Sequence, residues 1–284
     1  MVKKRYILTQ TLVDKFIIYL KLNERSRATI EKYQRDIKKF MYYLPKNCYL
    51  NKLVVLNWKE SLIQQNYAVS SINSMLAAIN SLFHFLNWEE LRVKQMKIQR
   101  QPFRQNEKDL SRAEYRLLLQ TAKERKNMRL YFILQTICST GLRVSELSFV
   151  SVEAVNRGTM TVSLKGKSRI VFLPQVLCVR LRRYIKENGI KKGSIFLTHR
   201  GKPISRHQIW VEMKNLAKFA KVETSKVFPH NLRHLFALCY YSQDKDLAKL
   251  ADLLGHSSLE TTRLYVVMSG SEHEKLINRM KLIE

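Results

Sequence analysis

Five side chains suited to proton transfer or phosphate binding stand at predicted turns and helix starts, where they can reach a substrate. They are Arg143, Lys165, His230, Arg233 and His256, and Tyr265 follows nine residues after the last of them. Arginine holds anionic oxygens with a planar, permanently charged fork, whereas imidazole exchanges protons near neutral pH. These residue types, with a tyrosine hydroxyl nearby, suit acid–base chemistry and phosphate binding.

Each residue taken alone also has a purely structural interpretation. Arg143 could form an ordinary surface ion pair with Glu146, three residues on, and Lys165 could be a solvated turn lysine. His230 and Arg233 could cap or pair locally, as residues one helical turn apart often do. By the same reasoning, the tyrosine near the end of the chain could simply pack in a helix–turn–helix corner. The set as a whole therefore carries the functional hypothesis.

The elements expected around these residues are mostly helical. Ser111 and Glu114 have capping-box spacing and predict a helix start, and a helix over 128–139 ends before Gly141. A short helix beginning with Arg143 should follow. Two β-prone runs, 159–164 and 169–173, flank a tight turn and predict a hairpin. Further helices are expected at about 175–187, 205–220, 229–242, 245–254 and 271–283, with a short strand at 195–198.

The glycine–histidine corner before Tyr265 has its own local signals. Gly255 stops one helix, and Ser257 and Glu260, again at capping-box spacing, begin the next one. That helix would deliver Tyr265 to the site that His256 faces.

Residues 10–90 are expected to form a separate four-helix bundle. Apolar residues step by three and four along 26–44 and 69–86, and shorter helices fit 10–22 and 51–65. Basic residues occupy the opposite face of the helix over 26–44. Such a stripe is either a solvated face or a phosphate-binding surface, and its repetition over the bundle favours phosphate contact.

Segment 93–108 is basic, polar and without amphipathic period, so it predicts an interdomain linker. The predicted domains are therefore a helical domain over 1–92 and a second domain over 109–284, which ends in a helix at about 271–283. The fold class is mainly α, with a mixed α/β second domain that is mostly helical and contains a small sheet.

The net charge is +28, from 51 Lys and Arg against 23 Asp and Glu. Such an excess favours a polyanionic partner, nucleic acid or an acidic membrane, because binding releases counterions. No apolar run approaches a membrane span, and four scattered cysteines without metal-ligand spacing fit reduced thiols in the cytosol. The sequence also lacks a glycine-rich phosphate loop and a carboxylate cluster with metal spacing, so neither a cofactor nor a metal is expected.

Taken in order, these motifs resemble the tyrosine recombinase, or phage integrase, family. The octapeptide 140–147, TGLRVSEL, is similar to the family's first-arginine motif, and 230–234, HNLRH, to its histidine–x–x–arginine box. Leu254-Gly255-His256 is similar to its last histidine motif, and Tyr265 has the spacing of its nucleophile. Lys165 lies where the family has a hairpin lysine, although the short turn leaves Lys167 as a rival.

The resemblance implies attack of Tyr265 on a DNA phosphodiester, giving a 3′-phosphotyrosyl link and a free 5′-hydroxyl. A phenol of ordinary pKa, about 10, is almost wholly protonated at pH 7, so its proton must be removed during attack. His230 would assist there. Arg143, Arg233 and His256 would stabilise the phosphorane oxygens, and Lys165 would protonate the leaving oxygen. Glu146 would be a supporting residue that orients Arg143 or His230.

The resemblance further implies a C-shaped clamp on a double-stranded DNA site, with 1–92 as the DNA-binding domain and 109–284 as the catalytic domain. The helix at about 271–283 would dock on a neighbouring protomer or pack on its own domain. Four protomers would act on two duplexes through a Holliday junction, whereas the protein in solution could be a monomer. The length of the chain is closest to that of simple Xer-type recombinases or transposon-borne cointegrate resolvases. Such a protein would act in the cytoplasm. The competing hypotheses are a catalytically idle DNA-binding protein on the same scaffold and a type IB topoisomerase.

Overall fold

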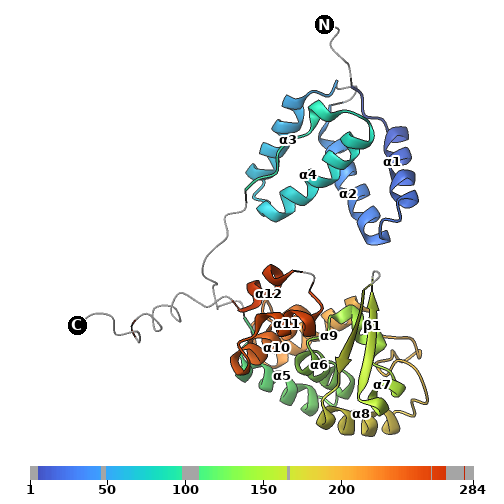
Figure 1. The fold of residues 1–284 in the computed structure, drawn as a ribbon, viewed down its shortest axis with the longest axis vertical. Helices are drawn as coiled ribbons and strands as arrows, with labels where there is room; N and C mark the ends of the chain where they lie inside the picture. The colour runs from blue at the N-terminus through green and yellow to red at the C-terminus, as the bar shows by residue number, and fades with distance from the viewer. Residues whose placement is uncertain are drawn as a thin grey trace. The chain divides into compact units, whose positions relative to one another are not determined.

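The computed structural model describes residues 6–45, 49–97, 109–164, 167–256, 258–266 and 278, without the side chains of Leu164 and Lys167. The chain divides into two compact units, Met1–Arg100 and Gln101–Glu284 (Figure 1). Both are mostly helical, as predicted. The division falls inside the segment assigned to the linker. Within the described ranges, no helix combines the length and apolar character needed to cross a membrane.

The first unit contains four helices close to the predicted positions. They are α1 (Gln10–Leu22), α2 (Arg27–Tyr43), α3 (Lys52–Gln64) and α4 (Val69–Phe85), followed by a 3₁₀ turn, η1 (Glu89–Leu91). The Ser26 hydroxyl accepts from the Thr29 N–H and so fixes the start of α2. Phe40 packs edge-on against Trp58 and Phe83, at ring-centroid distances of 4.8 and 6.2 Å. These buried rings join three of the helices into one core.

The second unit begins with the predicted capping box, in which Ser111 and Glu114 each bond the other's backbone N–H. Its helices are α5 (Arg112–Glu124), α6 (Met128–Thr140), η3 (Val144–Phe149, 3₁₀), α7 (Val152–Arg157), α8 (Gln175–Glu187), α9 (Arg206–Phe219), α10 (Pro229–Gln243), α11 (Leu247–Leu254) and α12 (Leu259–Val266). The short helix α7 was not predicted. The strand expected at 195–198 was wrong, because within this segment only Leu197 pairs, in an isolated bridge with Pro203.

The predicted hairpin is present but its second strand starts earlier than expected. Strand β1 (Thr159–Leu164) pairs antiparallel with β2 (Lys167–Phe172), from Thr159 opposite Phe172 to Leu164 opposite Lys167. The backbone of Lys167 therefore belongs to the ladder, whereas residues 165–166 lie outside the described residues. The predicted four-residue turn was too long because Lys167 and Ser168 pair across the strands.

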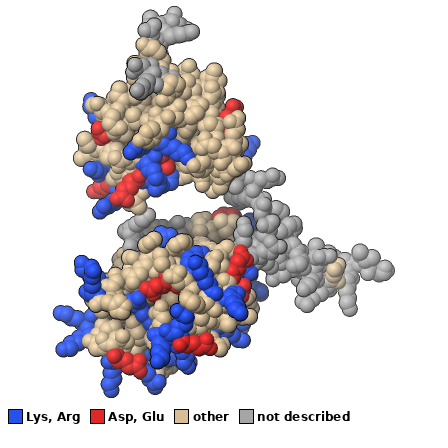
Figure 2. Space-filling model, turned by 180° about the vertical axis from the view of Figure 1, so that it is seen from behind, with Lys and Arg blue, Asp and Glu red and all other residues tan. Residues whose placement is uncertain are grey.

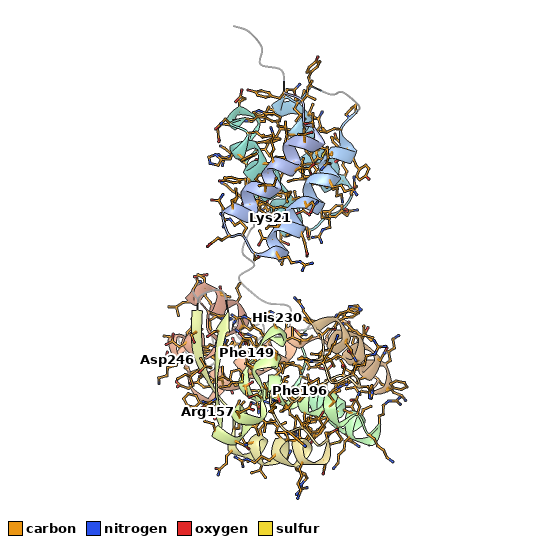
Figure 3. All side chains as sticks on the ribbon, turned by 90° about the vertical axis from the view of Figure 1, so that its right-hand side faces the viewer. Lys21, Phe149, Arg157, Phe196, His230 and Asp246 are labelled. Atoms are coloured by element: carbon orange, nitrogen blue, oxygen red, sulfur yellow. The ribbon has the colours of Figure 1, made fainter. Side chains whose placement is uncertain are left out.

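Helix α10 lies against α6 and also contacts α11 and α12, which brings distant parts of the sequence together. The large core of the unit includes Leu134, Leu181, Phe196 and Leu232, and Figure 3 shows Phe196 in its interior. Beside it, Ala237, Leu250, Leu254 and Tyr265 form a smaller buried cluster. Through this cluster, α12 is packed onto the helices that carry the other candidate residues.

Candidate active site

Arg143 is positioned by the way α6 ends. Gly141 adopts a left-handed conformation with φ of 66°, and a Cβ there would lie 2.6 Å from the Phe236 ring. Glycine is therefore required at this turn. Arg143 becomes the N-cap of η3, which therefore begins at Val144, one position after the predicted helix start. Its backbone N–H donates to the Glu146 carboxylate at 2.8 Å, and its guanidinium donates to Glu146 at 3.0 Å and to the Gly255 carbonyl at 3.1 Å.

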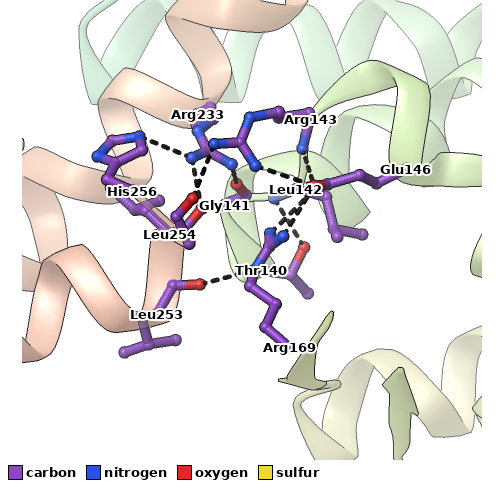
Figure 4. A network of polar contacts seen from close by, with 11 residues as sticks. Thr140, Gly141, Leu142, Arg143, Glu146, Arg169, Arg233, Leu253, Leu254 and His256 are labelled. Atoms are coloured by element: carbon purple, nitrogen blue, oxygen red, sulfur yellow. Dashed lines mark hydrogen bonds and ion pairs between the residues drawn. The ribbon is translucent and has the colours of Figure 1, made fainter. Parts of the chain in front are cut away.

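Glu146 is buried between two arginines (Figure 4). Its side chain is only 1% exposed, so the Arg143–Glu146 pair is not an ordinary surface ion pair. The Arg169 guanidinium, on β2, donates hydrogen bonds to both carboxylate oxygens at 2.7 and 2.9 Å. Its Nε–H donates to the Leu253 carbonyl at 3.2 Å. Burial would raise the pKa of Glu146, but hydrogen bonds from Arg169 and from the Arg143 backbone outweigh it and lower the pKa. The carboxylate is thus charged, and it holds Arg143 in place.

Arg233 is also a buried charged group of the site, with 2% of its surface exposed. Its guanidinium donates to the carbonyls of Gly141 at 2.6 Å and Leu254 at 2.7 Å, and it meets His256 Nε2 at 2.8 Å. Three of its five N–H groups are used in this way. Burial, and then the charge of Arg143, lower its pKa to about 10, which still leaves it cationic at pH 7. The remaining N–H groups can serve an anion in the site.

His256 lies directly after Gly255, whose φ of 64° ends α11 as predicted. A Cβ on Gly255 would lie 2.7 Å from Cδ of Arg169, so the glycine also makes room for that arginine. The imidazole Nδ1 lies 2.8 Å from the hydroxyl of Thr262, on α12. Burial, followed by the charges of Arg233 and Arg143, lowers the pKa of His256 to about 4. The ring is therefore neutral at pH 7.

Tyr265 is docked among the other candidate residues. Its hydroxyl lies 3.2 Å from Nε2 of His230, which stands in the first turn of α10 (Figure 3). The two rings are 5.3 Å apart, and the His256 ring is also 5.3 Å from that of Tyr265. The tyrosine is 8% exposed and packs with Leu250 and Leu254. A hydroxyl, an imidazole that can take its proton and two arginines thus form one cluster.

A cavity of about 370 Å³ opens beside this cluster. Arg143, His230 and Arg233 line one part of it, and Arg206, Trp210 and Lys214 of α9 line another. A phosphodiester group fits within this volume, and three arginines and a lysine on its wall favour an anion. Figure 2 shows that Lys and Arg side chains predominate among the charged groups on the pictured face of this unit.

Of the predicted residues, the structure brings together Arg143, Glu146, His230, Arg233, His256 and Tyr265. Lys165, the capping serine Ser257 and almost all of the docking helix at 271–283 lie outside the described residues. Within the described ranges, no group of three or more His, Cys, Asp or Glu side chains is arranged to hold a metal ion.

The sequence analysis missed three residues that contact the candidate set: Arg169, His234 and Thr262. His234 follows His230 by four residues and Thr262 precedes Tyr265 by three, so helical spacing could have placed both on the right faces. Arg169 gave no such signal, because it precedes three apolar residues of a strand.

Two family models match the chain. The phage integrase family matches residues 108–271, and the phage integrase N-terminal SAM-like domain matches residues 13–90. A relative from Pyrococcus furiosus, the tyrosine recombinase XerA, is 29% identical over 288 residues, covering 98% of this chain and 96% of that protein. The matched regions contain all the candidate site residues.

Solved structures of similar fold cover nearly the whole chain. One is a Tn1549 transposon integrase in complex with transposon right end DNA, with a TM-score of 0.74 and 15% identity, covering 96% of this chain and 99% of that one. Another is a lambda integrase tetramer bound to a Holliday junction, with a TM-score of 0.74 and 18% identity, covering 90% of this chain and 76% of that one. At these identities the likeness concerns the fold.

Proposed function

Since the chain belongs to the phage integrase family and is a Xer-type tyrosine recombinase, which cleaves and rejoins DNA at specific sites, we propose that Tyr265 is its nucleophile. The observation that carries this proposal is the contact of the Tyr265 hydroxyl with His230, 3.2 Å away, beside Arg143 and Arg233. The phenol oxygen attacks the scissile phosphorus while His230 takes up its proton. The product is a 3′-phosphotyrosyl link.

Arg143 and Arg233 stabilise the negative charge that builds on the non-bridging oxygens. Both line the cavity next to His230, and Arg233 is fixed by two backbone carbonyls, so little reorganisation is needed when the phosphate arrives. His256 accepts a hydrogen bond from Arg233 while the site is empty of DNA. It donates to a phosphate oxygen only after it has taken up a proton, which the anionic phosphate favours.

The bond from phosphorus to the 5′ oxygen breaks as the phenol–phosphorus bond forms. The leaving oxygen needs a proton, and we assign its delivery to Lys165, with Lys167 as the rival donor on the same hairpin. Attack of a free 5′-hydroxyl on the phosphotyrosyl link reverses the steps and rejoins the strand. One phosphate ester replaces another in each step, so the reaction consumes no nucleotide.

The substrate we propose is a double-stranded recombination site, held by the helical domain 1–92 and the catalytic domain 109–284 as a clamp. The titles of the solved structures describe DNA complexes and, for lambda integrase, a tetramer on a Holliday junction. A homotetramer on two duplexes is accordingly the proposed active assembly, and the cytoplasm its location. The biological outcome would be resolution of cointegrates or dimers, or movement of a genetic element.

The test is to recover the DNA that becomes attached to Tyr265. The protein is incubated with fragmented DNA of its source organism, denatured, captured and sequenced at the point of attachment. We expect one recurrent sequence joined through its 3′ phosphate. Two copies of that sequence in a plasmid should then yield excision when direct and inversion when inverted. Attachment without sequence preference, or no attachment, would contradict the proposal.

A further inference from the structure

The helix that carries Tyr265 cannot hold its position by itself. Helix α12 has eight residues, well below the length at which an isolated helix is stable in water. Its placement must come from contacts with its neighbours. Thr262 provides one such contact, to His256, and the Tyr265 hydroxyl provides another, to His230.

A third contact holds the backbone of the nucleophile itself. The carbonyl oxygen of Tyr265 lies 2.7 Å from Nε2 of His234. This carbonyl is in the last turn of α12, where carbonyl groups have no partner within the helix. The imidazole therefore satisfies an acceptor that a buried helix end would otherwise leave unpaired.

His234 and His230 are four residues apart on α10 and so face the same side of that helix. The His234 ring lies 5.4 Å from the Tyr265 ring, and the His230 ring lies 5.3 Å from it. One helix thus holds the tyrosine at both ends, with His230 at the hydroxyl and His234 at the carbonyl.

The protonation of His234 follows from its partners. A carbonyl oxygen can only accept, so Nε2 must carry a hydrogen. On the other side of the ring, Nδ1 lies 3.6 Å from a carboxylate oxygen of Asp109, and both side chains are largely buried. At this distance the Asp109 carboxylate can pair with the ring when the ring is cationic, and a cationic donor would bind the carbonyl more strongly. A cation is also favourable at the C-terminal end of a helix.

We propose that His234, supported by Asp109, is a positioning residue that fixes the backbone of Tyr265 and so keeps its hydroxyl at His230. Its importance for cleavage rests on the proposed function, but the positioning itself can be measured without DNA. Asp109 stands two residues before the N-cap of α5. The segment that enters the catalytic unit is thereby linked to the nucleophile through one imidazole.

The variants are chosen to distinguish the effect of side-chain size from the effect of the hydrogen bond to the Tyr265 carbonyl. In His234→Gln the amide nitrogen reaches about as far as Nε2 and can still donate to the Tyr265 carbonyl. In His234→Asn the amide stops near the position of Nδ1 and cannot. Asp109→Asn removes the negative charge with little change of shape. His207→Gln, at an exposed position of α9, is the matched control.

Hydrogen exchange of the DNA-free protein is the primary measurement. We expect amides of 259–266 to exchange about tenfold faster in His234→Asn, as loss of one buried hydrogen bond implies, and less than that in Asp109→Asn. His234→Gln should stay near the wild-type rate, and peptides of α6 and α8 should not change in any variant. Unchanged exchange of 259–266 in His234→Asn would overturn the proposal. Two other results would also overturn it: equally faster exchange throughout the catalytic unit, or faster exchange of 259–266 in His234→Gln as well. Either would mean that His234 only fills space in the core.

Covalent attachment to DNA is the second measurement. His234→Asn should form the adduct at least tenfold more slowly with unchanged DNA affinity, and His234→Gln should restore most of the rate. Failure of the wild-type protein to form any adduct would contradict the proposed function and leave the exchange result standing.

Discussion

The guanidinium Nη2 of Arg233 lies 2.8 Å from Nε2 of His256. A guanidinium can only donate, so His256 must accept through an unprotonated Nε2 and carry its hydrogen on Nδ1, toward Thr262. The neutral imidazole is therefore part of the support of Arg233 in the DNA-free site, in addition to the role toward phosphate that the family resemblance implies.

This arrangement predicts a dependence of stability on pH. The pKa of His256 is about 4 in the folded protein and 6.5 for an unperturbed histidine. Between these values the unfolded chain binds more protons, so the free energy of unfolding should fall as the pH falls from about 6.5 toward 4. Calorimetry of the catalytic-unit transition over this range should show a steeper loss of Tm for the wild type than for His256→Gln. Parallel pH profiles for the two proteins would contradict the neutral assignment.

The two arginines should respond differently to replacement by lysine. Both Arg143→Lys and Arg233→Lys should slow adduct formation by about 10²–10³-fold, since lysine lacks the planar fork. Arg233→Lys should also cost about 1–3 kcal/mol of stability, more than Arg143→Lys, because one ammonium replaces a buried guanidinium that bonds the carbonyls of Gly141 and Leu254. Single-turnover cleavage and denaturant unfolding of both variants measure the difference. Equal stability losses would contradict the larger contribution assigned to the buried contacts of Arg233.

Arg169 should prove essential to the fold of the site. Removing it in Arg169→Met leaves the buried Glu146 carboxylate without its bidentate partner, at an expected cost of about 3–5 kcal/mol. Adding Glu146→Gln should recover part of that loss, because the neutral amide needs no counter-charge. Arg157→Met, at an exposed position of α7, serves as the control, with an expected change of about 0.5 kcal/mol or less. The double variant unfolding as readily as Arg169→Met alone would refute this coupling.

Residues 271–284 include the helix predicted at about 271–283, which has Leu276, Ile277, Met280 and Ile283 on one apolar face. The family resemblance implies that this face docks on a neighbouring protomer, and packing on its own domain is the alternative. We predict an effect of deleting residues 271–284. Deleting them should leave binding to a single site intact while impairing synapsis or coordinated cleavage. Gel-shift and recombination assays on a two-site plasmid would separate these steps. Recombination at the wild-type rate by the truncated protein would rule out the docking role.

Much of the fold could be predicted because local signals are strong in this sequence. Ser26, Ser111 and the left-handed glycines Gly141 and Gly255 mark helix ends by their own chemistry, and the structure has helix ends at each of them. The residues 195–198 were assigned wrongly for the opposite reason. Their composition is β-prone, but composition does not show whether a neighbouring segment is available to pair with them. In the structure Leu197 forms a single isolated bridge instead of a strand.

Arg169 shows why part of the site could not be predicted. In strand β2, Ile170 and Phe172 are 62% and 68% exposed, while Arg169 and Val171 face inward. Alternation alone would have placed the larger apolar pair inside. The ion pair of Arg169 with Glu146, 23 residues away, stabilises the observed register, and a long-range pair of this kind leaves no local pattern. His234 did leave a local signal, its spacing of four residues from His230, but its partners Asp109 and Tyr265 are distant in the sequence and could not be predicted.

The central claim is that Tyr265 forms the covalent link to DNA. The most direct measurement is formation of a denaturant-resistant protein–DNA adduct on a suicide substrate carrying the recovered site, with wild type and Tyr265→Phe compared. The wild type should accumulate the adduct. Tyr265→Phe should bind the same DNA and form none, because it keeps the ring packing with Leu250 and Leu254 but lacks the hydroxyl. An adduct that persists in Tyr265→Phe would place the nucleophile on another residue.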